Sequence, residues 1–514
     1  MILRERLGPV AEPVGAAVAD LIERGAVARM WAGDFTLWSE DPTEVADRLG
    51  WLHVIEESQQ SFAEVDGMAL AAKGDGLSVA VVLGMGGSSL FPEVLARTFP
   101  KGLASLDLRV LDTTDPAAVQ RIEEEADLAS VLFVVASKSG TTLETRSHLA
   151  HFWERTGGDG SRFVAISDPG SELAELADER RFRATFRNRA DIGGRYSALS
   201  HFGVVPGALL GYDVVRLLER AAEAAEELGA KGPPDEHAGL RLGAVLGAAA
   251  KSGWDKLTLV LPVEIAAFGL WLEQLVAEST GKQGTGILPV AGEALGAPDV
   301  YGDDRLFVAV GEAARHPGLE ALAGAGHPVV ELAYAGPDDL GPLVLLWEQA
   351  VALSGAVLGI NPFDQPDVAA AKEATGRVLE NGLPTIEPTP VAELLEAVRP
   401  GDYLALQAFV DPGDGALLDQ LEAVRLRLRD RHRVATTLGV GPRFLHSTGQ
   451  LHKGGPPAGV FLQVLGEDHL DVPIPGQPYG FSMLKQAQAA GDLQALQERG
   501  LRAGRVRVEE LLGS

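Results

Sequence analysis

The fold of this chain is indicated by the stretch Val131-Leu132-Phe133-Val134-Val135 and the hydroxyl-rich run that follows, Ser137-Lys138-Ser139-Gly140-Thr141-Thr142-Leu143-Glu144-Thr145. The short apolar run is typical of a buried strand, and the next segment should begin a helix. Gly140 permits a positive φ, which lets backbone N–H groups converge, and a helix N-terminus adds free donors. The loop fits a phosphate monoester. It fits equally well the Ser/Thr-rich N-cap of an ordinary strand–helix connection.

Similar apolar runs recur on both sides of this stretch, separated by segments of helical length. They lie at 78–83, 106–111 and 162–166, then at 257–261, 306–310 and 328–332, then at 403–406, 433–437 and 460–464. Strands buried on both faces and alternating with helices predict parallel, doubly wound sheets. We therefore predict an α/β protein with a helical N-terminal segment (1–60), two similar α/β domains (61–232 and 233–400) and a C-terminal α/β extension (401–514).

The composition excludes several classes of protein. The chain has 514 residues, with 44 Lys and Arg against 72 Asp and Glu, giving a net charge of −28. That balance argues against a nucleic-acid or anionic-membrane partner. The absence of cysteine excludes disulfides, thiolate catalysis and cysteine-ligated metals. No signal-peptide core follows the first residues, and no uninterrupted apolar stretch is long enough to span a bilayer, so we expect a cytoplasmic protein.

Two glycine-rich segments could meet a ligand at the carboxyl edge of the sheet, where ligands of such folds bind. Gly84-Met85-Gly86-Gly87-Ser88-Ser89 follows the strand at 78–83 and allows close backbone approach. It lacks a dinucleotide fingerprint, since Ser89 replaces the third glycine, and a tight turn explains it as well. Gly193-Gly194-Arg195 places an arginine that could bind an oxyanion, or form a structural ion pair.

Candidate acid–base groups follow in the second half of the chain. Glu278 lies at the end of an apolar helix, where negative charge is disfavoured unless it is used or paired. Burial there would raise its pKa, as a general base requires, whereas an exposed glutamate is the plain alternative. Lys372 follows the turn 361–366, and a lone lysine is usually solvated. His446 and His452 share the glycine-rich segment 443–455. They could exchange protons, and no convincing third ligand for a metal accompanies them.

Taken in order, these segments resemble the glucose-6-phosphate isomerase (phosphoglucose isomerase) family, which is built on paired sugar-isomerase (SIS) domains. The resemblance covers roughly residues 55–380. The hydroxyl-rich loop 137–145 looks like the phosphate loop of the family, and Gly84–Ser88 looks like its first glycine loop. Gly193–Ser197 looks like the catalytic arginine signature, Glu278–Lys282 the segment of the base, and Asp364-Gln365 with Lys372 the C-terminal signature. The region after Pro400 resembles the isomerase part of bifunctional transaldolase–isomerase proteins.

The resemblance implies reversible conversion of glucose 6-phosphate into fructose 6-phosphate through a cis-enediol, a step of glycolysis and gluconeogenesis that needs no cofactor or metal. Glu278 is then the base, Arg195 stabilises the enediolate, and Lys372 helps to open the sugar ring. The implied substrate-binding residues are Gly86, Gly87, Ser88, Ser137, Lys138, Ser139, Thr141, Thr142 and Gln365. A homodimer is also implied.

One departure from the family concerns its catalytic histidine. The family carries a Gly-Gln-His block between the base and the lysine, and this interval of the chain has no matching histidine. Gly449-Gln450-Leu451-His452 resembles the block but lies after Lys372. We therefore predict that His446 or His452 supplies the missing function. A non-catalytic phosphosugar-binding regulator and an isomerase of another phosphosugar, such as mannose 6-phosphate, remain as alternatives.

Overall fold

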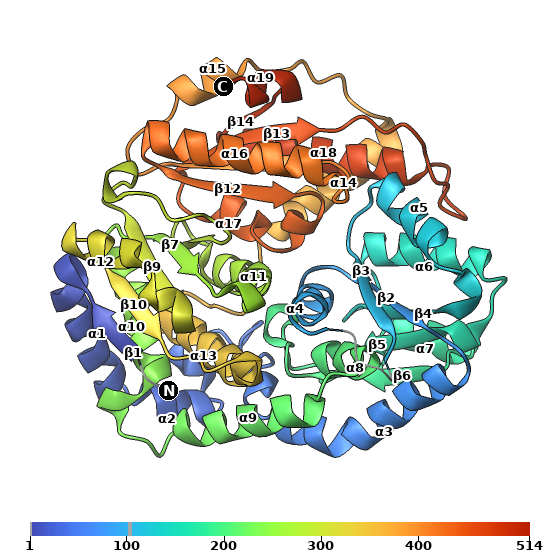
Figure 1. Ribbon diagram of the computed structural model, residues 1–514, viewed down its shortest axis with the longest axis horizontal. Coiled ribbons are helices and arrows are strands. Elements are labelled where there is room, and N and C mark those ends of the chain that lie inside the picture. The colour runs from blue at the N-terminus through green and yellow to red at the C-terminus, as the bar shows by residue number, and fades with distance from the viewer. Residues whose placement is uncertain (1–2, 101–104) are drawn as a thin grey trace.

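The computed structural model describes residues 3–100 and 105–514, which form three α/β units around a common centre (Figure 1). The first unit holds a parallel five-stranded sheet in the order β3-β2-β4-β5-β6. Its strands are β2 (Val79–Leu83), β3 (Asp107–Leu111), β4 (Val131–Ala136), β5 (Phe163–Ser167) and β6 (Ala184–Arg187). Its helices are α3 (Val54–Gly74), α4 (Leu90–Thr98), α5 (Pro116–Glu125), α6 (Leu143–Arg155), α7 (Glu172–Glu179), α8 (His201–Leu210) and α9 (Val214–Glu227).

The second unit has a five-stranded sheet in the order β1-β10-β9-β7-β8. Its strands are β1 (Leu3–Arg6), β7 (Lys256–Val260), β8 (Leu288–Val290), β9 (Arg305–Val310) and β10 (Val329–Leu332). All pairs are parallel except β1 with β10. Its helices are α1 (Ala11–Glu23), α2 (Ala26–Trp31), α10 (Ala238–Lys251), α11 (Phe268–Thr280), α12 (Pro317–Gly324) and α13 (Leu340–Leu358).

The third unit is a parallel four-stranded sheet in the order β12-β11-β13-β14. Its strands are β11 (Tyr403–Phe409), β12 (Ala435–Val440), β13 (Gly459–Leu465) and β14 (Arg502–Arg505). The accompanying helices are α14 (Val368–Asn381), α15 (Val391–Glu396), α16 (Gly415–His432), α17 (Gly449–Gly454), α18 (Phe481–Glu498) and α19 (Val508–Leu512). Helix α14 packs against α18, although the sequence suggested a domain boundary near residue 400.

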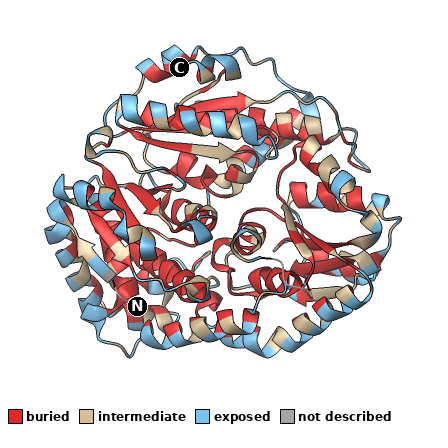
Figure 2. Ribbon diagram, viewed as in Figure 1, coloured by how far each residue is buried: buried red, intermediate tan, exposed pale blue. Residues whose placement is uncertain are grey.

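The first sheet is buried on both faces, as its apolar strands predict. Along β2, Ala80 and Val82 join one apolar core, while Val81 and Leu83 join a second core on the opposite face. Successive side chains of a strand point to opposite faces, so a strand that is apolar throughout needs cover on both. Figure 2 shows the strands and the helices nearest the centre as buried. The predicted fold class, α/β with parallel sheets, is confirmed.

The N-terminal segment differs from the prediction of an all-helical stretch. It begins with β1, which pairs antiparallel with β10 through Leu3 and Leu332. The strand lies at the edge of the sheet, and its sequence, Leu-Arg-Glu-Arg, lacks the apolar run that marks a buried strand. Among the described residues one helical stretch, Pro337–Leu358, is long and apolar enough to cross a membrane, and 94% of its window is buried inside the protein, as in a core helix.

Candidate active site

The hydroxyl-rich loop joins β4 to α6 at the carboxyl edge of the first sheet, as the sequence predicted. Its hydroxyls bond one another: Ser139 Oγ lies 2.7 Å from Thr141 Oγ1, and Ser137 Oγ lies 3.2 Å from Thr142 Oγ1. Gly140 has φ +76°, and its N–H donates to Ser137 Oγ at 3.1 Å. Thr142 precedes the helix without capping it through its side chain. The loop thus presents hydroxyls and a helix N-terminus to one side, which suits a phosphate dianion.

Lys138 does not take part in this arrangement. Its ammonium pairs with Asp168 and donates to the carbonyl of Ala190 at 2.8 Å. Both partners belong to neighbouring segments of the first unit, so the lysine side chain holds the hydroxyl-rich loop against those segments. The sequence suggested Lys138 as a substrate ligand because it lies inside the motif. Its ammonium makes structural bonds to Asp168 and Ala190, and its contact with substrate stays a prediction.

The glycine loop after β2 serves close packing. A Cβ added at Gly87 would lie 1.9 Å from the carbonyl oxygen of Gly194, and one at Gly86 would lie 2.8 Å from that of His446. Gly86 also has φ +55°, which favours glycine. These glycines, with Ser88, form the short helical turn Gly86–Ser88 and let the arginine segment and the histidine segment approach the first sheet. Their contacts with protein are therefore clear, whereas their contact with substrate stays a prediction.

Arg195 is buried and fixed by four hydrogen bonds. Nε donates to Ser279 Oγ at 2.8 Å and Nη1 to Gln365 Oε1 at 2.9 Å, while Nη2 donates to the carbonyls of Pro362 at 2.7 Å and Asp364 at 2.9 Å. Its Nη1 lies 3.4 Å from the carboxylate of Glu278. A guanidinium held this way is a fixed positive group beside the predicted base. Gln365 is connected to the site because its side-chain oxygen accepts one of these bonds.

Glu278 lies in the last turn of α11, and its side chain retains 13% exposure. Gln274, one turn earlier on the same helix, donates from Nε2 to Glu278 Oε2 at 2.9 Å and to the carbonyl of His446 at 2.9 Å. The amide therefore connects the predicted base of the second unit to the histidine segment of the third. The sequence analysis did not single out Gln274. Its spacing of four residues from Glu278 on a helix was the available signal.

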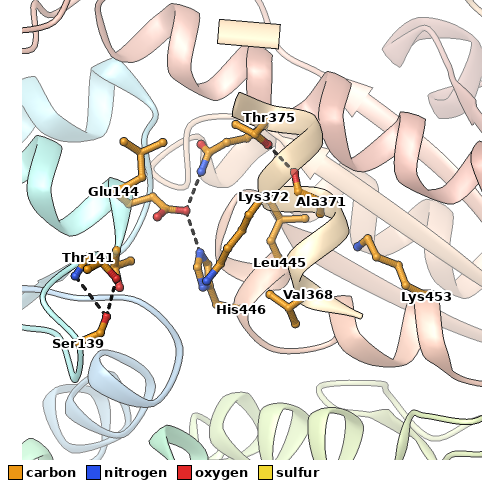
Figure 3. A pocket seen from close by; sticks show the side chains of 13 residues that line it. Ser139, Thr141, Glu144, Val368, Ala371, Lys372, Thr375, Leu445, His446 and Lys453 are labelled. Carbon is orange, nitrogen blue, oxygen red and sulfur yellow. Dashed lines mark hydrogen bonds and ion pairs between the residues drawn. The ribbon is translucent and has the colours of Figure 1, made fainter. Parts of the chain in front are cut away.

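A cavity of about 320 Å³ opens between the first and third units beside these residues. Ser139, Thr141 and Thr142 lie along one side, and Lys372 reaches into it from α14, close to His446 (Figure 3). Its lining also includes Leu143, Glu144, Val368, Ala371, Thr375, Leu445, Lys453 and Gln488. Glu278 and Arg195 do not line this cavity; they connect to it through Gln274 and the carbonyl of His446. The predicted base and the cavity are therefore joined through the Gln274 amide and the carbonyl of His446.

Glu144 and His446 both line the cavity and contact each other there. His446 Nε2 lies 2.8 Å from Glu144 Oε1, a contact drawn in Figure 3. Burial by itself would raise the pKa of Glu144, but the facing His446 and the nearby Lys372 lower it to about 2. The carboxylate is therefore ionised at neutral pH and accepts a hydrogen bond from the histidine. The sequence motif contained Glu144, yet its role became visible only through a partner 302 positions away.

His452 lies elsewhere. It is buried in α17 among Tyr403, Phe444 and Phe461, with its ring centroid 5.1 Å from that of Phe461. Burial, with a smaller effect of Lys453, lowers its pKa to about 3, so it is neutral. The structure does not bring it to the cavity. Of the two predicted histidines, only His446 lines it.

The histidine segment is anchored to the first unit by an ion pair. Arg443 donates from Nε to Asp112 Oδ2 at 2.8 Å and from Nη2 to Asp112 Oδ1 at 2.7 Å. Asp112 follows β3 at the carboxyl edge of the first sheet and also accepts from Ser89 Oγ at 3.1 Å. Because Arg443 and His446 belong to the same short turn, this pair fixes the position of the imidazole.

The chain is similar to known sugar-phosphate isomerases. The model of the family described as phosphoglucose isomerase matches residues 52–298, which contain the hydroxyl loop, Arg195 and Glu278. The predicted resemblance to this family is confirmed for these residues. A glucose-6-phosphate isomerase of Thermosynechococcus vestitus is 29% identical over 488 residues, covering 85% of this chain and 90% of that protein. Another, of Rubrobacter xylanophilus, is 29% identical over 371 residues, covering 60% of this chain and 84% of that protein.

Solved structures share the fold. A hypothetical protein of Thermus thermophilus aligns with a TM-score of 0.63 at 24% identity, covering 74% of this chain and 100% of that one. A glucose-6-phosphate isomerase of Chlamydia trachomatis aligns with a TM-score of 0.58 at 21% identity, covering 72% of this chain and 86% of that one. The prediction of an isomerase enzyme is supported by the sequence matches, and the structural likeness supports the fold.

Proposed function

We propose that this chain interconverts glucose 6-phosphate and fructose 6-phosphate. The observation that carries the proposal is the bridge formed by Gln274, which places the carboxylate of Glu278 and the segment of His446 on the same amide. Arg195 lies beside the carboxylate, and the hydroxyl loop lies across the cavity from Lys372. The match to the phosphoglucose isomerase model supports the same reaction.

In the proposed reaction the phosphate binds the hydroxyls of Ser139, Thr141 and Thr142, with Ser137 holding the loop. Opening the pyranose breaks the bond between C1 and the ring oxygen, which needs a proton at that oxygen and the loss of one from the C1 hydroxyl. His446 and Lys372 line the cavity and can exchange these protons. The histidine is the side chain we assign to the ring oxygen.

The isomerisation itself moves one proton between neighbouring carbons. Glu278 removes the proton from C2 of the open aldose and returns it to C1. In the same conversion O1 gains a proton and the C2 hydroxyl loses one, so the carbonyl passes from C1 to C2 through the cis-enediol. Arg195 stabilises the negative charge that develops on those oxygens, because a prearranged cation needs no reorganisation during the reaction. Gln365 acts by holding the guanidinium.

Replacing Glu278 by Gln tests the proposal. The amide keeps the shape but removes the base, so kcat should fall at least about 100-fold with little change in KM. Near-normal turnover of a folded variant would contradict the role of Glu278. A parent protein that binds sugar phosphates but exchanges no solvent deuterium into C1 or C2 would instead be a regulator. A panel including mannose 6-phosphate identifies the preferred substrate.

Three finer features belong to the same proposal. We infer that the third unit corresponds to the C-terminal part of the isomerase portion of bifunctional transaldolase–isomerase proteins, that the protein works in the cytoplasm, and that it assembles as a homodimer. Light scattering combined with activity measurements at high dilution tests whether the protein is a homodimer. An active monomer would contradict this inference.

A further inference from the structure

A chain of buried hydrogen bonds extends from the first unit through the third unit to the histidine. Thr114 Oγ1 donates to Gln488 Oε1 at 2.6 Å, and Gln488 Nε2 donates to Glu144 Oε1 at 2.7 Å. The same carboxylate oxygen contacts His446 Nε2 at 2.8 Å. Thr114 is fully buried and Gln488 is 3% exposed, so the bond between them is shielded from water.

The chemistry of the groups fixes the direction of every bond in this chain. Glu144 is ionised and can only accept, so Gln488 must turn its amide nitrogen toward it and its oxygen toward the hydroxyl of Thr114. The second donor to the carboxylate is then the Nε2–H of His446. Because Nε2–H is committed to this bond, Nδ1 is the ring nitrogen left to carry the proton that the ring oxygen receives when the sugar opens.

Gln488 belongs to α18, which packs against α14, the helix that carries Lys372. The amide therefore ties the position of Glu144 to the helix pair that borders the cavity. Its Nε2 bonds the same carboxylate oxygen that the imidazole contacts. Thr114, by contrast, is absent from the lining of the cavity and reaches the histidine only through Gln488 and Glu144.

We propose that Gln488 and Thr114 are positioning residues for ring opening, which orient the carboxylate of Glu144 so that His446 presents Nδ1 to the ring oxygen. The proposal rests on the function proposed above. It gives the third unit a second role in ring opening, because Gln488 positions the groups around His446. Because the open-chain sugar no longer needs this proton transfer, the effect belongs to cyclic substrates alone.

The experiment compares two ketose substrates. Fructose 6-phosphate is mostly cyclic, whereas 5-deoxyfructose 6-phosphate stays open because it lacks the hydroxyl that closes the ring. For Gln488→Met, which keeps the length and removes the polar atoms, we expect kcat on the cyclic sugar to fall about tenfold or more, with nearly normal turnover of the open one. Thr114→Val should give a smaller loss of the same kind, and Thr114→Ser should restore the parent value.

A double variant separates this role from general packing. If Thr114 acts through Gln488, adding Thr114→Val to Gln488→Met should lower kcat no further. Equal losses on both substrates, or independent effects of the two substitutions, would overturn the proposal. Nitrogen-15 NMR of the imidazole, assigned by comparison with His446→Gln, supplies a readout without turnover.

In the parent the NMR spectrum should show His446 with a slowly exchanging Nε2–H, which broadens in Gln488→Met and is retained in Thr114→Ser. An unchanged signal in Gln488→Met overturns the proposal. If the parent turns over neither ketose, the proposed function fails, and the NMR comparison still decides whether Gln488 and Thr114 hold His446.

Discussion

The ion pair between Arg443 and Asp112 gives a prediction whose magnitude follows from the structure. Two charge-assisted hydrogen bonds, at 2.8 and 2.7 Å, join the two side chains. The side chain of Asp112 is 3% exposed and that of Arg443 is 22% exposed. Removing one partner of a buried pair costs about 3–5 kcal/mol, and partial exposure of the arginine reduces this. For Arg443→Gln we therefore expect a loss of about 2–4 kcal/mol in the free energy of unfolding.

The same substitution should reduce activity, because Arg443 lies in the turn that carries His446. A displacement of about 1 Å in a reacting group can cost 100-fold, so we expect kcat to fall at least about tenfold. Arg121→Gln is the matched control: Arg121 pairs with Asp411 between the same two units but away from the cavity. It should lower stability and leave kcat unchanged.

Urea unfolding of the single and double variants measures the pair directly. A double-mutant cycle with Asp112→Asn should give a coupling energy of about 1–3 kcal/mol. Steady-state kinetics on the same samples gives kcat. A coupling below about 0.5 kcal/mol, or the same loss of kcat in Arg121→Gln, would refute the view that this ion pair positions the histidine.

Three further predictions concern other parts of the chain. Thr142→Ala should raise KM about tenfold or more with a smaller effect on kcat, and inorganic phosphate should compete with substrate in the parent; unchanged KM would place the phosphate elsewhere. Gly87→Ala should destabilise the protein by about 1–3 kcal/mol and lower kcat, because the added Cβ would lie 1.9 Å from the carbonyl preceding Arg195. Gly67→Ala is the control, because this helical glycine has open space around it, and it should be neutral or stabilising. If both variants had the same melting temperature and the same kcat, the packing argument would be wrong. Because burial lowers the pKa of His452 from 6.5 to about 3, the unfolded chain binds the extra proton and stability falls as pH drops from about 6.5 towards 3. His452→Leu should remove up to about 2 kcal/mol of the stability difference between pH 7 and pH 5, and identical pH dependence in both proteins would show that this histidine does not contribute.

The sequence determined the parts of this protein that depend on local pattern. The apolar run of β4, the glycine-permitted turn at Gly140 and the start of α6 follow one another within a few residues, so their physical causes are all contained in the stretch itself. The ordered motifs containing Arg195 and Glu278 were equally local, and the structure brings these two side chains within 3.4 Å.

Other features could not be predicted because their partners lie far away along the chain. β1 becomes a strand by pairing with β10, more than 300 residues later, and its own residues show no buried-strand pattern. The edge strands β6, β8 and β14 are short and were missed for a related reason, since a few residues carry little periodicity.

The two histidines of segment 443–455 are distinguished by their tertiary contacts. They lie six positions apart, and the local signal, the resemblance of Gly449-Gln450-Leu451-His452 to the Gly-Gln-His block, points to His452. His446 faces Glu144 of the first unit and lines the cavity, whereas His452 packs among the aromatic rings of its own unit. Lys138 shows the same principle, since its ion pair with Asp168, 30 positions later, could not be predicted from the motif. The pairing of charges and the packing of units depend on which surfaces meet in space, and a periodic pattern along the chain does not encode that.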